Sequence, residues 1–509
     1  MSRRPPSDES KPDSDRTRWL FGDQLGPHFL ADHDGPVLLI ESRRVFARRR
    51  FHRQKAHLVL SAMRHRAAEL GERGTLVRTA NYREALETVS GPLEVIQPTS
   101  RAAVELVRRL AEERDIERLP ARGFSTTRSE FDTWVNSRGT KRLLMEDFYR
   151  DARRRHDVLM DGAEPAGGSW NYDHDNREPP PKGATTLGVA EPRWPQEDEI
   201  DEQVRADLDA WEAAGDVTFL GVDGPRRFAA TRAEALAALD DFVEHRLPGF
   251  GPHEDAVLEG DDWMAHSLLS APFNLGLLDP AEVVDRAEAA YRSGAVPLAS
   301  AEGFIRQVMG WRDYIWHLYW HLGEDYRHSN HLGARRRLPD WFAGLDAEAT
   351  EARCLSHALA GVRDHGWVHH IPRLMVLGNY ALQRGWRPDE VTDWFHRAFV
   401  DGYDWVMVPN VVGMSQHADG GVLATKPYAA GGAYINRMTD HCGSCRFNPK
   451  VRVGDDACPF TAGYWAFLER NRERLAGNHR MAQTLHGLDR LSDLEALVEQ
   501  EARRGSDPP

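Results

Sequence analysis

The spacing of apolar residues changes part-way along the chain. Over residues 17–140, short apolar runs alternate with stretches of helical spacing. Short strands separated by helices are typical of βαβ units, in which helices cover both faces of a parallel sheet. From residue 231 onward, helical spacing recurs and strand signals almost disappear. The pattern therefore predicts an α/β domain followed by a large all-α domain.

Local sequence signals predict the boundaries of these domains. Residues 1–16 consist of Pro, Ser and charged residues, which predicts a disordered tail. The α/β domain is expected at 17–145, and Gly-Gly, Pro-Pro-Pro and an acidic run predict a connector at 146–230. The all-α domain follows at 231–509. Strands of the first domain are predicted at 17–23, 36–42, 76–80, 93–99 and 123–127.

Two features of these segments lead to specific expectations. Thr231 is followed three residues later by Glu234, a capping-box pattern that predicts the first helix of the all-α domain. The connector contains GGSWNYDHDNR at 167–177, which is rich in Trp, Tyr and Asn. A plain linker does not need such residues, so we expect this stretch to dock on the rest of the protein.

Composition narrows the range of functions. The 509 residues carry 79 acidic and 65 basic side chains, a net charge of −14. This charge argues against a protein coated in basic surface but allows a local basic groove. No run approaches the ~18 apolar residues of a membrane span, and the first residues lack the apolar stretch of a signal peptide. We expect a cytoplasmic monomer with no membrane partner.

The four cysteines form a set with a CxxC pair, a Cys-Pro pair and one distant member. Thiolates in such a set suit Zn²⁺ or an iron–sulfur cluster, and Cys-Pro also occurs in cluster-binding runs. The competing interpretations are two disulfides or four unrelated thiols. Both are less favoured, because the chain has a CxxC pair and no cysteine outside the set. So few cysteines also indicate a reducing compartment. The set is Cys354, Cys442, Cys445 and Cys458.

Trp, His and Arg are concentrated in the all-α domain. Eight of the 15 Trp lie between Trp311 and Trp405, which fits either a Trp-rich core or a ring-lined cavity for a flat cofactor. His365 and His369 would share one face if their segment is helical. The run RRR at 335–337 is either a solvated face or an edge that contacts phosphate. The sequence alone leaves these alternatives open.

Several stretches together resemble a known family. They are LFGDQLGPHF (20–29), GGSWNYDHDNR (167–177), HSLLSAPFNLGLLDP (266–280), EGFIRQVMGWRDYI (302–315), HHIPRLMVLGNY (369–380), DGYDWVMVPNVVGMSQHADGG (401–421) and TKPYAAGGAYINRM (425–438), with the four cysteines. The chain is similar to the prokaryotic iron–sulfur cryptochrome/photolyase group of deoxyribodipyrimidine photolyase-related proteins, which includes bacterial (6-4) photolyases. The resemblance covers about residues 17 to 480.

The resemblance implies cryptochrome/photolyase architecture, in which an α/β antenna domain precedes an all-α FAD domain. It implies a [4Fe-4S] cluster rather than zinc on Cys354, Cys442, Cys445 and Cys458. It also implies a 6,7-dimethyl-8-ribityllumazine antenna at the carboxyl ends of the first two strands, where open parallel sheets bind ligands. The implied antenna residues are Gly22, Asp23, Gln24 and Glu41.

The same resemblance implies that FAD is bound in a bent form inside the helical domain. The segment HSLLS would open a helix whose N–H groups meet the pyrophosphate. A carboxylate and an Arg near the ring suit a reduced, anionic flavin. The implied FAD residues are His266, Ser267, Leu268, Leu269, Ser270, Asn274, Glu302, Gln307, Trp311, Arg312, Arg373, Asp401, Asp404 and Asn410.

The implied activity is light-driven repair of (6-4) pyrimidine–pyrimidone lesions in UV-damaged DNA. Reduced FAD would pass one electron to a flipped-out lesion, with phosphates meeting local Arg clusters. His370, beside His369, is the expected proton donor, and Trp394 is the expected first relay for photoreduction. The alternatives are a cryptochrome-like photoreceptor with the same cofactors and no repair, and a nucleic-acid-binding protein with an inert zinc site.

Two positions depart from the family's pattern. Pro372 stands where the family commonly has Gln in HHIQRL, and Met407 and Val408 replace Glu-Leu in WVELPN. The missing carboxylate is expected to weaken a polar or cation-assisted contact at the lesion pocket. It modestly favours the photoreceptor, whereas the His-His pair modestly favours repair.

Overall fold

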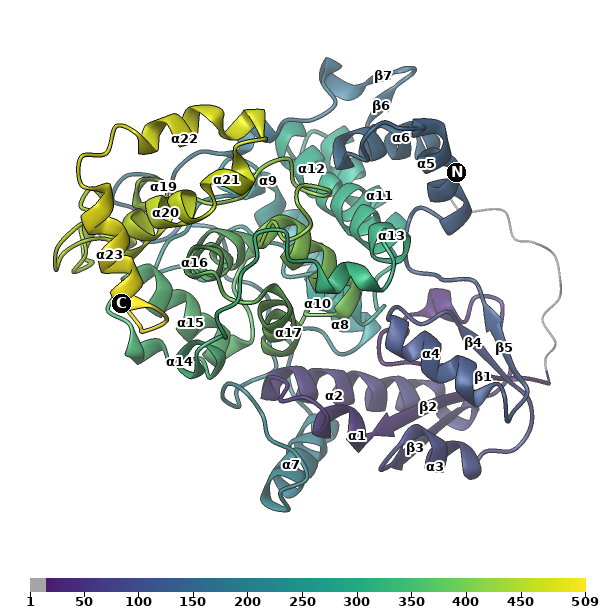
Figure 1. Ribbon diagram of the computed structural model, residues 1–509. Helices are drawn as coiled ribbons and strands as arrows, with labels where there is room; N and C mark the ends of the chain where they lie inside the picture. Colours follow the sequence, from purple (N-terminus) through teal and green to yellow (C-terminus); the bar gives the residue numbers. More distant parts are fainter. Residues whose placement is uncertain (1–14) are drawn as a thin grey trace.

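The computed structural model describes residues 15–509 (Figure 1). An N-terminal part that contains a sheet, purple and blue in Figure 1, lies against a larger helical part in teal, green and yellow. The predicted fold class is thereby confirmed. The expected tail at 1–16 lies outside the described residues except at its end, where Arg16 pairs with Asp115 at 2.9 Å.

Five parallel strands form the sheet, in the order β3-β2-β1-β4-β5. β2 and β4 are buried along their whole length, as expected for a parallel sheet with helices on both faces. The connecting helices are α2 (Arg53–Leu70), α3 (Tyr82–Glu87) and α4 (Arg101–Leu110). The strands are β1 (Thr17–Leu20), β2 (Val37–Ser42), β3 (Gly74–Thr79), β4 (Leu93–Ile96) and β5 (Ile116–Leu119).

The fifth predicted strand is wrong, whereas the other four are confirmed with somewhat different bounds. Residues 123–127 form a loop because they contact the helical part: the Phe124 ring stacks on Trp316 with centroids 4.3 Å apart. The strand at that edge is β5 instead. Its central residues Glu117 and Arg118 are exposed, so it lacks the apolar pattern by which strands are recognised.

The helical part begins as predicted. Thr231 accepts a hydrogen bond from the Glu234 N–H, and the reciprocal capping-box bond is present at the start of α8 (Arg232–Asp241). Further predicted helices are confirmed, with bounds that differ by a few residues. They are α11 (Pro280–Arg292), α12 (Leu298–Ile305), α13 (Asp313–His321), α15 (Arg353–His365), α16 (Asn379–Arg384), α17 (Pro388–Ala398) and α20 (Pro459–Arg470).

Four π-helical segments occur in the described part of the chain, and such segments often mark functional sites. One of them, η5 (Phe242–Arg246), follows α8, and the other three carry predicted FAD residues. η6 (Arg306–Arg312) joins α12 to α13, and η9 (Pro372–Gly378) leads into α16. η10 (Val408–Ser415) continues α18 (Asp404–Met407). All three segments carry residues that the sequence analysis assigned to FAD.

The segment expected to be a connector contains helices α6 (Met145–His156) and α7 (Glu199–Ala213). The prediction that the acidic run belongs to a linker is wrong: Asp198 caps α7 and the next acidic residues lie in its first turn, where carboxylates are favourable. The stretch 167–177 docks as expected: the Tyr172 N–H donates to Glu302 at 2.9 Å, and Asn176 donates to the Ala299 carbonyl at 3.1 Å. No helix within residues 15–509 is both long and apolar enough to cross a bilayer.

Candidate active site and cofactor sites

Distant segments of the helical part meet at one buried ion pair. Arg373 binds both carboxylate oxygens of Asp401, with N–O distances of 2.8 and 3.1 Å. Ser270 donates a hydrogen bond to the same carboxylate (2.6 Å), and Asn274 donates to the Asp401 carbonyl (2.9 Å). The structure thus brings together the residues that the sequence analysis placed around FAD at 266–274, 373 and 401.

The helix expected to open at residue 266 begins later. It is α10 (Ser270–Asn274), and Leu268 before it has a left-handed backbone with φ of 58°. This conformation is unfavourable for a residue with a side chain and breaks helical geometry. His266, Ser267, Leu268 and Leu269 therefore approach α10 as a turn rather than as its first turn of helix.

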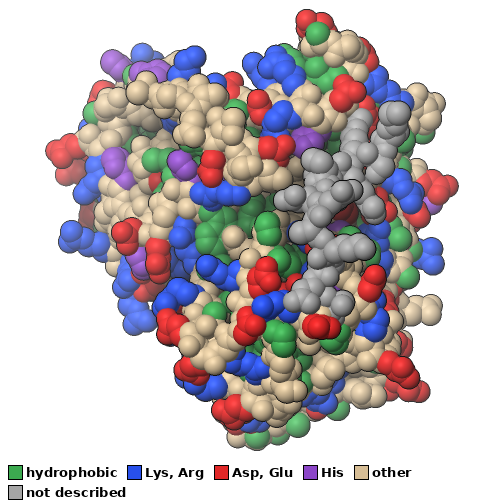
Figure 2. Space-filling view, turned by 90° about the vertical axis from the view of Figure 1, so that its right-hand side faces the viewer, with side chains coloured by type: hydrophobic (Ala, Val, Ile, Leu, Met, Phe, Trp, Pro, Cys, Tyr) green, Lys and Arg blue, Asp and Glu red, His purple; other side chains and the backbone are tan. Residues whose placement is uncertain are grey.

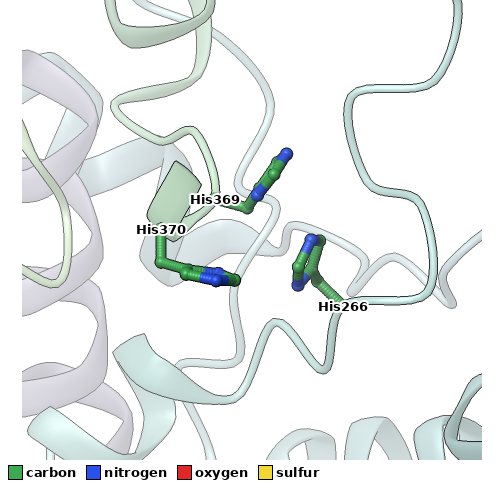
Figure 3. A group of neighbouring side chains, drawn as sticks. All are labelled: His266, His369 and His370. Atoms are coloured by element: carbon green, nitrogen blue, oxygen red, sulfur yellow. The ribbon is translucent and has the colours of Figure 1, made fainter. Parts of the chain in front are cut away.

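His266, His369 and His370 form a cluster near this ion pair (Figure 3). Their ring nitrogens lie within 4.8 Å of one another. The His266 and His369 rings stack with centroids 4.2 Å apart, and the Nε2 atom of each is buried without a hydrogen-bond partner among the described residues. Unsatisfied buried nitrogens are unfavourable, so this cluster is suited to receive a ligand.

The surroundings set different charges on the three imidazoles. Burial, and after it nearby positive charge, lowers the pKa of His266 and His369 well below the ordinary value. Burial opposes the charge of His370 too, but the hydrogen bond to Asp255 at 3.1 Å and the charges of Asp255 and Glu254 together outweigh it and raise the pKa of His370. His370 is therefore the member that retains a proton to the highest pH.

Two acidic residues that the sequence analysis missed complete the cluster. Asp255 accepts the His370 hydrogen bond, and its neighbour Glu254 accepts one from Gln307 at 2.8 Å. Burial raises the pKa of Glu254 to about 7. Both lie in the loop between α9 (Leu247–Phe250) and α10, where an adjacent acidic pair was the only available signal.

The predicted FAD residues on α12 and η6 lie on one side of this region. Glu302 is fully buried and pairs with Arg306 at 3.3 Å. Burial raises the pKa of Glu302. Gln307 reaches Glu254 from the next turn, and Trp311 packs at 6.5 Å from Tyr314.

The remaining predicted FAD residues make other contacts. Arg312 donates to the Gly123 carbonyl at 2.7 Å and lies 4.4 Å from the Phe124 ring, so it joins the helical part to the α/β part. Asp404 accepts a hydrogen bond from Tyr319 at 2.8 Å. Asn410 donates to Val406 of its own helix at 2.9 Å. A role toward FAD stays a prediction for these three residues, as it does for the other residues assigned to FAD.

Trp394 lies one ring away from the Arg373–Asp401 pair. Its indole is fully buried, 5.9 Å from the Phe399 ring, and Phe399 lies 4.3 Å beneath the Arg373 guanidinium. On its other side, Trp394 contacts Phe342 at 4.7 Å, and further rings lead outward to Trp386 and Trp341. This aromatic path runs from the buried ion pair to the partly exposed Trp341.

The four cysteines come together, and all are free thiols, so the disulfide alternative is wrong. Burial and the charges of the other three thiolates raise the pKa of Cys354, which places the four groups near one another. A [4Fe-4S] cluster on these four thiols stays a prediction, and so does the zinc alternative.

Of the predicted antenna residues, Gly22, Asp23 and Gln24 follow β1, where the strand order reverses between β1 and β4, and Glu41 lies in the neighbouring β2. Thr99, after β4, donates a hydrogen bond to Asp23, after β1. The second Asp23 oxygen is buried without a partner in the described part of the chain, and burial raises the pKa of Asp23. Gln24 donates to the Ile96 carbonyl at 3.0 Å. Open parallel sheets bind ligands at this crevice.

Gly22 and Glu41 occupy the same edge of the sheet in different ways. Gly22 lies against α2, where a Cβ atom would approach Val59 at 3.1 Å. Glu41 is already held by Arg64 at 2.8 and 3.0 Å and by Arg78 at 3.1 Å. The open acceptor at this edge is therefore Asp23.

Three sequence expectations in this region are modified. His365 and His369 do not share a helical face, because Gly366, with φ of 59°, ends α15 between them. Pro372 is the first residue of η9, where a missing N–H is harmless. Met407 is 4% exposed and lies in an apolar cluster with Trp394, so the departure from Glu suits its surroundings.

On the coloured part of the face in Figure 2, Lys and Arg side chains are interspersed with Asp and Glu, and hydrophobic side chains line a central hollow. Positive charge on this part of the face is therefore confined to local groups, in line with the negative net charge.

Comparison with known proteins identifies the family. A family model described as "Deoxyribodipyrimidine photo-lyase-related protein" matches residues 18–216. The chain is 39% identical over 498 residues to a (6-4) photolyase of Agrobacterium fabrum, which covers 93% of this chain and 95% of that protein. The chain belongs to the photolyase-related family. The predicted resemblance is confirmed, and membership of this family implies FAD as a cofactor.

Solved structures show that this photolyase-related chain shares the family's fold. A bacterial class III photolyase from Agrobacterium tumefaciens matches with a TM-score of 0.59 at 16% identity, over 98% of each chain. A cryptochrome from Synechocystis sp. PCC6803 matches with a TM-score of 0.56 at 12% identity, over 96% of this chain and 98% of that one.

Proposed function

We propose that the chain is a blue-light-dependent (6-4) photolyase, a lyase that repairs (6-4) pyrimidine–pyrimidone photoproducts in UV-damaged DNA. The observation that carries this proposal is the His370–Asp255 pair beside the Arg373–Asp401 group. Reduced FAD, bound at that group and excited by blue light, would supply one electron to the lesion. The identity of 39% to a (6-4) photolyase over most of the chain supports the same conclusion.

The chain's own residues then divide the remaining tasks. Arg373, held by Asp401 and by the Val368 carbonyl at 2.6 Å, provides a fixed positive charge near the flavin. His266 and His369 are neutral and offer their open Nε2 atoms to a flipped-out base. His370 holds a proton and delivers it as negative charge develops on the lesion, where a hydroxyl must move between bases.

Two further cofactors belong to this proposal. A [4Fe-4S] cluster would be held by the four cysteines, because four neighbouring thiolates need positive charge to offset their repulsion. A 6,7-dimethyl-8-ribityllumazine antenna would bind near Gly22, Asp23 and Gln24, where the open Asp23 oxygen is available to a ring N–H or ribityl hydroxyl. Glu41 would contribute through its contact with Arg64.

The experiment that tests the function is illumination of purified protein with DNA that contains a (6-4) lesion, followed by chromatography of the product. The wild-type protein should restore the two pyrimidines. His370→Ala should abolish repair and keep FAD content, cluster colour and DNA binding. His245→Ala, which removes a half-exposed histidine, is the matched control.

The outcomes separate the proposed function from its alternative. Light-induced FAD reduction without repair by the wild-type protein would support the cryptochrome-like photoreceptor instead. Repair by His370→Ala within about twofold of the wild-type rate, the range of an ordinary surface substitution, would move the proton-donor role to His369 or away from (6-4) chemistry.

A further inference from the structure

A pocket opens between α16, α20 and the loop that precedes α14 (Asp340–Ala343). It encloses about 220 Å³ and is closed on one side by α21 (Arg472–Leu475). Buried Trp386, Gln416 and Asn471 contribute to its floor. The arginines that line it are Arg335, Arg336, Arg384, Arg470 and Arg474.

The positive charge of this arginine pocket is not balanced from within. No Asp or Glu is among its lining residues. In the part of the chain that the structure describes, Arg336 and Arg470 donate to backbone carbonyls rather than to carboxylates. Burial and the nearby Arg384 and Arg336 lower the pKa of Arg470 to about 10. Guanidinium groups therefore crowd together in a chain whose net charge is −14.

Arg384, which also lines the arginine pocket, has a buried side chain that is 2% exposed. Glu501 accepts a hydrogen bond from one of its terminal nitrogens, but Nε and the other terminal nitrogen have no partner among residues 15–509. Arg336, Arg470 and Arg474 also line the pocket, and no carboxylate lines it, so the pocket is suited to an anion.

The sequence run RRR is divided by this arrangement. Arg335 and Arg336 line the pocket, whereas Arg337 turns outward and lies 3.9 Å from Glu390, with 88% of its side chain exposed. Of the two interpretations left open by the sequence, the phosphate-contacting one fits the first two arginines and the solvated one fits the third.

The arginine pocket is separate from the candidate active site. His370 precedes the continuous helix formed by η9 and α16, and Arg384 ends it. Residues 375–384 are buried, so this helix passes through the interior of the helical part. At 1.5 Å per residue, its two ends lie about 20 Å apart.

We propose that the arginine pocket binds a pyrophosphate group, either free or as the diphosphate of a nucleotide. Guanidinium groups match phosphate oxygens in charge and in paired donor geometry. The several arginines suit a group with several negative charges better than a single phosphate. A volume of 220 Å³ is below that of pockets that enclose a drug-sized ligand, so the base and sugar of a nucleotide would remain outside. This inference does not depend on the repair activity.

Isothermal titration calorimetry of the full-length, FAD-saturated protein tests the proposal. Inorganic pyrophosphate, inorganic phosphate and ADP are titrated separately in chloride buffer of constant ionic strength, because screening weakens non-specific attraction equally in each. Pyrophosphate should bind saturably with one site per chain, and phosphate should bind about tenfold or more weakly. If ADP binds more tightly than pyrophosphate, the ligand of the pocket is the diphosphate of a nucleotide. If ADP binds equally or more weakly, the ligand is free pyrophosphate.

Matched double variants locate the site. Arg335→Gln with Arg474→Gln removes two exposed pocket arginines and should weaken pyrophosphate binding about tenfold or more. Arg337→Gln with Arg503→Gln removes the same charge outside the pocket and should stay within about twofold. Absence of saturable pyrophosphate binding, an equal loss in both variants, or binding by duplex DNA without binding by pyrophosphate would each overturn the proposal.

Discussion

The charge of His370 depends on two carboxylates from another part of the chain, Asp255 and Glu254. Its neighbour His369 is buried and neutral, although the two residues are adjacent in sequence. The difference arises because only His370 reaches Asp255. At the scale of the residue, the candidate chemistry is thus set by the position of a loop at 251–265 rather than by the HH motif itself.

Replacement of Asp255 should therefore change the pH dependence of repair. Because Asp255 raises the pKa of His370, activity that needs the imidazolium is present at low pH and is lost as the pH rises through that pKa. Asp255→Asn lowers the pKa of His370, so the alkaline limb of the repair profile should move to lower pH. Asp240→Asn, at an exposed carboxylate of α8, is the control. An unmoved limb would show that His370 is not the titrating donor.

A second residue-scale prediction concerns the buried indole of Trp394. Phe at this position keeps most of the ring volume, so FAD should remain bound. Photoreduction of FAD by an external reductant should slow strongly, because a benzene ring gives up an electron far less readily than an indole. The rate of photoreduction is measured from the flavin absorbance during continuous illumination. Trp465→Phe, on α20, should leave the rate unchanged; unchanged photoreduction in Trp394→Phe would move the first relay to Trp386 or Trp341.

At the scale of the element, helix ends and π-helical segments gather the candidate groups. Arg373 lies in η9 and Gln307 in η6, so wider turns place residues that a regular 3.6-residue period would direct elsewhere. Cys354 is in the first turn of α15, and Cys458 is the residue before α20. A metal group held by the four cysteines would therefore join the beginnings of two long helices to the segment that carries Cys442 and Cys445.

Loss of one cysteine ligand should destabilise both helices. Cys442→Ala should reduce the iron content from about four atoms per chain to near zero and remove the broad visible absorbance of the cluster. The melting temperature and soluble yield should also fall, because metal binding contributes to folding in such sites. Ser444→Ala, between the CxxC cysteines but without a thiolate, is the matched control. Zinc in place of iron in anaerobically purified wild type would contradict the cluster.

At the scale of the whole molecule, the two parts are joined by buried cations. Arg312 of the helical part reaches Gly123 and Phe124, and Lys55 of α2 donates to the carbonyls of His396 and Gly402. Burial lowers the pKa of Lys55 to about 7 and that of Arg312 to about 10. These contacts hold the α/β part against the helical part, which includes the segment that carries Asp401.

Arg312→Met should weaken this junction. The variant loses a charged hydrogen bond of 2.7 Å and a cation–π contact but keeps much of the apolar stem. We expect the free energy of unfolding to fall by about 2 kcal/mol, measured by urea denaturation. Arg128→Met, on the exposed face of α5 (Arg128–Arg138), should change it by less than about 0.5 kcal/mol. Equal stability of Arg312→Met and wild type would exclude a role in joining the two parts.

The fold class, most helices and the Thr231 cap could be predicted from the sequence, because they depend on local periodicity and capping, which neighbouring residues set. The family resemblance rests instead on the identities of residues in several stretches of the chain. Tertiary structure alone decided that Asp255 meets His370, that Arg312 faces the α/β part, that residues 123–127 form a loop, and that Arg335 and Arg336 share a pocket with Arg470. Each of these outcomes joins residues far apart in the chain, and their energies come from burial and charge at contacts that no local pattern records.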